Sequence, residues 1–131
     1  MILLDGNTLI YYIRGMDSVV RRFQATPRLE LRIPTVVAYE IEYGALKIGS
    51  PRRRRVTDRL LAGIAQIPFD AEAAGATVRI RIDLENRGLV IGPLDLMIAG
   101  TAISREAVLV TNNIQEFSRV RGLRLADWSR G

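Results

Sequence analysis

The chain has 131 residues, of which 48% are apolar and 25% charged, a composition typical of one ordered domain over residues 1–131. It contains no cysteine and no histidine, which excludes disulfides, thiolate nucleophiles, imidazole bases and zinc sites built on either residue. Nineteen basic residues against fourteen acidic ones give a net charge of +5, and this balance favours a polyanionic partner such as nucleic acid.

All but one of the basic residues are arginine, Lys47 being the only lysine. The alternative explanation is a GC-rich genome and a surface charge that serves only solubility. No basic segment precedes an apolar one at the N-terminus, and no apolar run is long enough to span a membrane. We therefore expect a cytoplasmic protein that uses carboxylates, amides and hydroxyls, which suit hard cations such as Mg²⁺ or Mn²⁺.

The first predicted strand covers residues 2–4 and ends at Asp5, which places a carboxylate at the carboxyl end of a strand. A turn then leads into a helix that Asn7 or Thr8 can cap. Asp17 can cap a second helix, which stops before Pro27.

A strand over residues 29–34 is predicted next, followed by a helix that Thr35 can cap and that Gly49 ends. Ser50 caps another helix, whose first turns carry four arginines at residues 52–55. Because cations are unfavourable near a helix N-terminus, this run either binds phosphates or is a solvated face.

A short strand over residues 66–69 precedes a long helix that Asp70 caps and Gly88 ends. The apolar stripe of this helix is predicted to be Ala71, Ala74, Val78 and Ile82. A Gly-Pro pair at residues 92–93 opens the following helix, with Asp95 in its first turn.

The last predicted strands are residues 107–110 and 123–125, and between them a polar turn at residues 111–113 leads to Glu116. An ordinary asparagine-rich turn would have the same pattern. Because strands and helices alternate without a two-residue hairpin signal, we expect a three-layer α/β/α sandwich around a mostly parallel sheet of four to five strands.

Ligands of such sheets bind beyond the carboxyl ends of the strands, where loops and helix N-termini meet. Asp5 and Asp95 are candidates there, the alternatives being a helix cap for Asp5 and a contact with the helix dipole for Asp95. Glu40 and Glu42 point about 200° apart on one helix, so at most one of them faces a common site. Periodicity alone does not choose between the two glutamates.

Four segments together resemble the PIN-domain family, and in particular the VapC toxins of bacterial and archaeal toxin–antitoxin pairs. The segments, in this order and at appropriate spacing, are LLDGNTLIYYIRG, YEIEYGA, IGPLDLMIAG and LVTNNIQEFSRVRGLRLADW. The resemblance spans nearly the whole chain. It implies a PIN-like fold and a metal-dependent endoribonuclease that hydrolyses structured RNA, often a transfer or ribosomal RNA.

By this resemblance the family's metal-binding aspartates fall on Asp5 and Asp95, its helix glutamate on Glu40, and its fourth acidic position on Asn113. The implied cofactor is Mg²⁺ or Mn²⁺, bound by the two aspartates and by Glu40 directly or through water. Such an ion would polarise a phosphate and acidify the attacking water. The implied catalytic set is therefore Asp5, Glu40, Asp95 and Asn113.

Three positions depart from the family's pattern. Asn113 replaces an aspartate, for which Glu116 can compensate, while Gly6 and Leu94 stand where the family usually has polar side chains. These changes affect the surroundings of the metal ligands more than the ligands. The further candidates for supporting the site or contacting RNA are Asn7, Thr111, Glu116, Arg52, Arg53, Arg54, Arg55, Arg79 and Arg81.

The resemblance also implies partners, namely a VapB-type antitoxin whose C-terminal segment inserts into the acidic cleft and a second copy in a homodimer. The runner-up interpretation is a PIN-like module that binds RNA or protein without efficient catalysis. A third is a phosphotransfer receiver or a haloacid-dehalogenase-like phosphatase. The first of these lacks a suitably placed lysine, and the second lacks its DxD pair because Asn7 follows Gly6.

Overall fold

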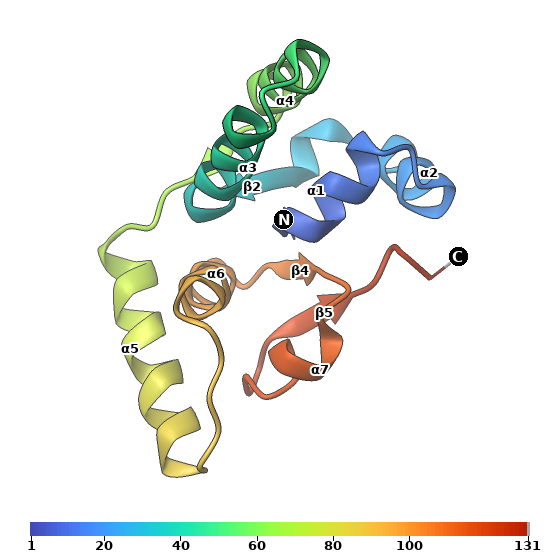
Figure 1. Ribbon diagram of the computed structural model, residues 1–131. Helices are drawn as coiled ribbons and strands as arrows, with labels where there is room; N and C mark the ends of the chain where they lie inside the picture. Colours follow the sequence, from blue (N-terminus) through green and yellow to red (C-terminus); the bar gives the residue numbers. More distant parts are fainter. Residues whose placement is uncertain (131) are drawn as a thin grey trace.

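The structure is a computed structural model that describes residues 1–130, which form five strands and seven α-helices (Figure 1). The strands are β1 (Ile2–Leu4), β2 (Leu31–Pro34), β3 (Gln66–Ile67), β4 (Val108–Val110) and β5 (Arg124–Ala126). The helices are α1 (Gly6–Ile13), α2 (Asp17–Ala25), α3 (Thr35–Ile48), α4 (Pro51–Gly63), α5 (Ala71–Asn86), α6 (Pro93–Ser104) and α7 (Ile114–Phe117), with a short 3-10 turn, η1, at Arg28–Glu30. Within this part of the chain, no helix combines the length and apolarity needed to cross a membrane.

The five strands form one sheet in the order β3-β2-β1-β4-β5, and every pairing is parallel. The central strand β1 is buried, with Leu3 and Leu4 fully inaccessible. Leu4 pairs with Val110 of β4, so the residues that follow them, Asp5 and Thr111, leave the sheet side by side. The predicted parallel sheet is confirmed, and its register places two candidate residues together.

The order in which the chain adds strands across the sheet reverses once, although all strands stay parallel. From β1 the chain moves outward to β2 and β3, and it then crosses back to β4 on the other side of β1. Because parallel crossovers are right-handed, this reversal moves the helices to the opposite face. Figure 1 shows α1 to α4 on one side of the strands and α5 to α7 on the other. The point of reversal lies between β1 and β4, where open α/β sheets bind ligands.

The predicted helix starts are partly correct. Ser50 and Asp70 cap α4 and α5, since their side chains accept hydrogen bonds from the N–H groups of residues 53 and 73. Asp17 and Thr35 were expected to be caps, but each is the first residue inside its helix. The Thr35 hydroxyl instead donates a hydrogen bond to the carbonyl oxygen of Ile67, which ties α3 to β3.

The predicted apolar stripe of α5 is wrong. The buried residues of this helix are Ala73, Ala76, Ile80 and Leu84, whereas Val78 and Ile82 are 57% and 54% exposed. Residues 80 and 82 point about 200° apart on a helix, so α5 is apolar on two faces. Periodicity detected the second face and could not tell which one packs on the core.

Helices α5 and α6 approach each other most closely at Gly100. A Cβ atom at this position would overlap Thr77 Oγ1 and lie 2.9 Å from the carbonyl oxygen of Ala73. Thr77 is itself held by a hydrogen bond from its hydroxyl to the Ala73 carbonyl, at 2.7 Å. The absence of a side chain at residue 100 thus sets the spacing of the two helices. This spacing positions the start of α6, which carries Asp95.

Candidate functional site

Asp5 is buried at the carboxyl end of β1, with 5% of its surface exposed. Its Oδ1 accepts a hydrogen bond from the Thr8 N–H at 2.9 Å, and its own N–H donates to the Val110 carbonyl at 3.1 Å. Asp5 therefore caps α1, in place of the expected Asn7 or Thr8. Burial raises the pKa of Asp5, and hydrogen bonds from Thr111 and Thr8 offset part of this effect.

Glu40 and Asp95 are half-buried and approach Asp5 from two different helices, α3 and α6. A Cβ on Gly6, the first residue of α1, would lie 3.8 Å from Glu40 Oε1. Burial raises the pKa of Glu40, and the charges of Asp95 and Asp5 raise it further. Glu42 is exposed, as expected for the residue that does not face the site.

The same physical effects act on Asp95. Burial is the largest cause that raises the pKa of Asp95, followed by the charges of Glu116 and Asp5. Every neighbouring charge that raises the pKa of Asp5, Glu40 or Asp95 is thus the charge of another carboxylate. The three predicted acidic residues form one electrostatically coupled group at the carboxyl ends of the strands, where the strand order reverses between β1 and β4.

Asn113 and Glu116 form a bridge from the loop after β4 to the start of α6. Asn113 Nδ2 donates to Glu116 Oε2 at 2.9 Å, and Glu116 Oε1 accepts from the Gly92 N–H at 3.0 Å. These hydrogen bonds, with Asn113 first, lower the pKa of Glu116 and keep it ionised. Gly92 is the N-cap residue of α6, so the bridge anchors the turn that presents Asp95.

The remaining polar candidates hold the loops around Asp5. Buried Thr111 accepts a hydrogen bond from the Asn113 N–H at 3.0 Å. Asn7 Nδ2 donates to Asn112 Oδ1 at 3.2 Å, and Asn112 donates to the Tyr11 hydroxyl at 2.8 Å. Asn7 therefore links the start of α1 to the loop after β4 and does not act as a cap.

A fifth acidic residue, Asp127, was missed in the sequence. It follows β5, and its charge contributes to the raised pKa of Asp5. Its Oδ1 accepts hydrogen bonds from the N–H and hydroxyl of Ser129, and its Oδ2 lies 3.4 Å from Arg130 Nε. The signal that could have found it is its position two residues after the predicted strand over residues 123–125, close to the kind of strand end that selected Asp5.

The arginine candidates are dispersed. Arg54 and Arg81 lie in ion pairs with Asp58 and Glu85, at 3.3 and 3.2 Å. Arg52 and Arg53 line a hollow at the start of α4. The other two arginines, Arg55 on α4 and Arg79 on α5, are exposed. The structure therefore does not bring the nine polar and basic candidates into one cluster.

The acidic group fits a hard cation by its chemistry. Its donors are carboxylate oxygens, which Mg²⁺ and Mn²⁺ prefer, and the charge of Asp5 raises the pKa of both Glu40 and Asp95. A bound cation would remove this mutual repulsion. Within residues 1–130, no three acidic side chains are already arranged to enclose a metal ion. Binding therefore requires side-chain adjustment, for which Glu40 and Asp95, half-buried at the rim, have room.

Comparison with known proteins finds relatives that match nearly the whole chain. The family model described as "PIN domain" matches residues 2–123. The chain is 40% identical over 128 residues to the tRNA(fMet)-specific endonuclease VapC of Shigella flexneri, which covers 97% of both chains.

Two solved structures are similar over almost their whole length. One is VapBC2 from Rickettsia felis bound to a DNA fragment from its promoter, with a TM-score of 0.86, 34% identity, and coverage of 98% of this chain and 99% of that one. The other is DNA-bound VapBC from Salmonella typhimurium, with a TM-score of 0.87, 36% identity and 97% coverage of both chains.

Proposed function

Because the chain belongs to the PIN-domain family and to its VapC branch, we propose that it is the ribonuclease toxin of a VapBC toxin–antitoxin pair. The observation that supports this most directly is the electrostatically coupled group of Asp5, Glu40 and Asp95 at the point where the strand order of the sheet reverses. We further propose that the reaction depends on Mg²⁺ or Mn²⁺, that the substrate is a structured RNA such as a transfer RNA, and that the protein acts in the cytoplasm.

Asp5 and Asp95 are the proposed ligands of the metal, with Glu40 beside them. A bound Mg²⁺ or Mn²⁺ would offset the charge of the phosphate and acidify a water molecule. Glu40 is proposed to hold the ion directly or through a water molecule. The Asp5 carboxylate accepts a hydrogen bond from the Thr8 N–H, which holds it in place as the least mobile of the proposed ligands.

Asn113 and Glu116 are proposed to position Asp95. The amide of Asn113 holds Glu116, and Glu116 holds the N–H of Gly92 at the start of α6. Where the family often has an aspartate, this chain thus has a neutral amide that places a carboxylate nearby. This arrangement supports the expectation that Glu116 compensates for Asn113.

The antitoxin is proposed to cover the exposed apolar face of α3. Tyr39, Tyr43 and Leu46 are 61%, 57% and 61% exposed and repeat at helical spacing, and Lys47 Nζ lies 5.7 Å from the centre of the Tyr43 ring. Glu40 and Tyr43 are three residues apart and so are neighbours on the surface of α3, which would bring a partner on this face close to the acidic group. Large exposed apolar surfaces of this kind mark protein interaction sites.

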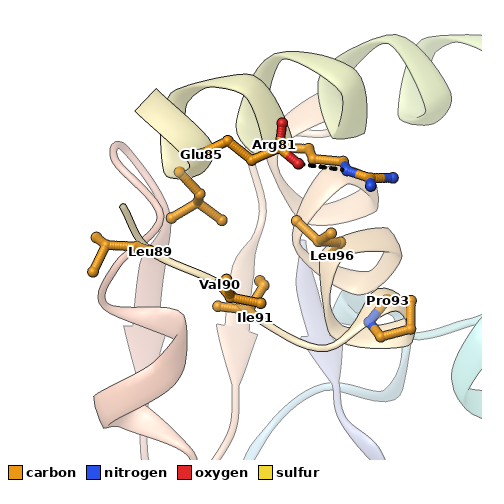
Figure 2. Close-up of a pocket in the computed structure, with 8 residues that line it drawn as sticks. Arg81, Glu85, Leu89, Val90, Ile91, Pro93 and Leu96 are labelled. Carbon is orange, nitrogen blue, oxygen red and sulfur yellow. Dashed lines mark hydrogen bonds and ion pairs between the residues drawn. The ribbon is translucent and has the colours of Figure 1, made fainter. Parts of the chain in front are cut away.

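A second copy of the chain is proposed to pack on α5. A cavity of about 300 Å³ lies between the end of α5 and the start of α6. Its lining includes Leu89, Val90, Ile91 and Pro93 (Figure 2). The ion pair of Arg81 and Glu85 lies at its rim. Exposed Val78 and Ile82 are on the same side of α5 as this pair, which extends the apolar surface.

The test is cleavage of RNA by the purified chain. The protein is freed of metal with a chelator and incubated with total cellular RNA, with and without added Mg²⁺ or Mn²⁺. Discrete cleavage is expected only with metal, and Asp5→Asn, Glu40→Gln and Asp95→Asn should each lower the rate at least 100-fold, as losses of catalytic groups do. Glu42→Gln is the matched control, and it should keep full activity.

Two outcomes would contradict the proposal. If metal-free protein cleaves RNA as well as metal-loaded protein, the metal dependence is wrong. If the wild type and the three variants leave several RNA pools equally intact while binding them, the chain is an RNA-binding module rather than a nuclease.

A further inference from the structure

A basic hollow lies between the ends of α1 and α3 and the start of α4. It has a volume of about 330 Å³. Arg14, Arg52 and Arg53 line it together with the apolar side chains of Ile13 and Val56, and no carboxylate takes part in its lining. The hollow is separate from the acidic group, whose residues Asp5, Glu40 and Asp95 take no part in its lining.

The three arginines are free to bind an anion. Within residues 1–130, none of Arg14, Arg52 and Arg53 lies in an ion pair, whereas neighbouring Arg54 is held by Asp58. The Nε of Arg53 is buried and has no hydrogen-bond partner. A buried guanidinium N–H without an acceptor destabilises the fold. An oxygen of a bound anion would supply the missing hydrogen-bond acceptor.

The start of α4 adds to this positive field. The helix has 13 residues and no acidic residue in its first turn, so the positive end of its dipole is uncompensated. The ends of α1 and α3 oppose it with roughly half a negative charge each, which three guanidinium groups outweigh. The hollow is therefore net positive and would attract a phosphate group.

The hollow lies at the C-terminal ends of α1 and α3, whereas the acidic group lies at the start of α1 and midway along α3. Gly6 of α1 lies beside Glu40 of α3, and Ile13 and Ile48 line the hollow together. Seven to eight residues at 1.5 Å of rise separate the two places on each helix, which is about 12 Å. An RNA strand of a few nucleotides is long enough to reach both places.

We propose that Arg14, Arg52 and Arg53, with the start of α4, bind a phosphate of the RNA a few nucleotides away from the phosphate that is cleaved. The inference rests on the proposed ribonuclease function and adds a second contact to it. This contact selects substrates long enough to reach both places. It contributes to binding and takes no part in the chemical step.

The experiment measures RNA binding in chelator and, separately, the kinetics of cleavage with metal. The variants are Arg52→Gln and Arg53→Gln, and Arg54→Gln is the matched control, since it removes one charge from the same run outside the hollow. Thermal unfolding shows whether each variant is folded. Exposed Arg52 carries the test if Arg53→Gln does not fold.

Arg52→Gln and Arg53→Gln are expected to weaken RNA binding about tenfold near 0.1 M salt and to reduce the salt dependence by about one phosphate contact. KM should rise with kcat unchanged, and Arg54→Gln should change binding less than twofold. Methylphosphonate substitution at single linkages should weaken binding to the wild type at one position, a few nucleotides from the cleaved bond, and not weaken binding to Arg52→Gln there.

The inference is overturned if the wild type cleaves RNA and the three variants bind it alike. It is also overturned if Arg52→Gln binds RNA normally but loses binding of an acidic peptide, because the hollow would then serve a protein partner. If the wild type binds but does not cleave RNA, the nuclease proposal fails. The binding comparison between Arg52→Gln and Arg54→Gln still decides whether the hollow holds a phosphate.

Discussion

Asp5 combines two roles at the scale of the single residue, since it caps α1 and belongs to the acidic group. The sequence allowed two interpretations of Asp5, a helix cap or a functional carboxylate, and the structure shows that the two are compatible. One oxygen satisfies a helix N–H, and burial keeps the pKa of the whole carboxyl group raised. Folding and function thus depend on the same side chain.

The cap and the charge of Asp5 can be separated by substitution. Asp5→Asn keeps a side-chain oxygen that caps well and removes the buried charge, whereas Asp5→Ala removes both. The alanine variant is expected to have a free energy of unfolding roughly 0.5–2 kcal/mol below that of the asparagine variant. Urea unfolding in chelator measures the difference. Equal stability of the two variants would show that the cap contributes nothing.

The raised pKa values of Glu40 and Asp95 predict how stability depends on pH. Because the folded chain holds these protons more tightly than the unfolded one, the groups favour folding most below their ordinary values of 4.5 and 3.8. This contribution is lost as pH rises through the raised pKa values. Glu116 has the opposite sign, since its lowered pKa stabilises the fold above 4.5 and stops doing so as pH falls.

Glu40 and Asp95 are therefore expected to make the metal-free protein less stable as pH rises above 4.5, and this effect should be smaller in Asp95→Asn. Midpoints of thermal unfolding across this range in chelator are the measurement, and added Mg²⁺ should flatten the curve. Asp58→Asn, which removes an exposed carboxylate of α4, is the control. Identical pH profiles for the two variants would show that the acidic group does not carry the effect.

Much of the site could be predicted from single residues, and the limit lay in contacts between distant ones. Asp5 followed from its position at a strand end, whereas the position of Asp95 at a helix start left a contact with the helix dipole equally open until the family resemblance selected it. Glu40 could not be separated from Glu42 by periodicity, because an acidic site formed by three elements leaves no pattern within one helix. The bridge from Asn113 through Glu116 to Gly92 depends on a contact across 24 residues and has no local signature.

At the scale of the element, the parallel sheet and the order of helices were predictable because apolar runs and helix caps are local signals. The inner face of α5 was not. Ala73 and Ala76 face α6, and small residues at a close contact give a weaker apolar signal than Val78 and Ile82 on the outside. A helix that is apolar on two faces needs two partners, of which the fold supplies one.

The close contact of α5 and α6 makes Gly100 a sensitive position. Gly100→Ala places a methyl group against the Ala73 carbonyl and should lower the free energy of unfolding by about 1–3 kcal/mol, although alanine favours helices. Gly44→Ala in α3 is the matched control, since nothing lies within 4 Å of its added methyl group. It should be neutral or stabilising by up to about 1 kcal/mol. Similar effects of both variants in urea unfolding would contradict the packing argument.

At the scale of the whole molecule, the two exposed apolar surfaces predict two separable assemblies. Ile82→Glu on α5 should make the chain monomeric in light scattering and leave capture of its co-expressed antitoxin intact, because a buried charge without a partner is costly. Tyr43→Glu on α3 should do the reverse. Each variant is the control for the other, and an exchange of the two effects would reverse the assignment of the surfaces.

The double role of Asp5 also bears on how cells would escape the proposed toxin. Selection for survival favours any change that silences the enzyme, but replacing Asp5 with a residue that cannot cap α1 also lowers stability and hence abundance. Loss of Glu40, which caps no helix, leaves the scaffold and its partner surfaces in place. Survivors that keep a full complement of inactive protein should therefore carry changes at Glu40 more often than at Asp5. Such cells would retain a decoy that still occupies the antitoxin.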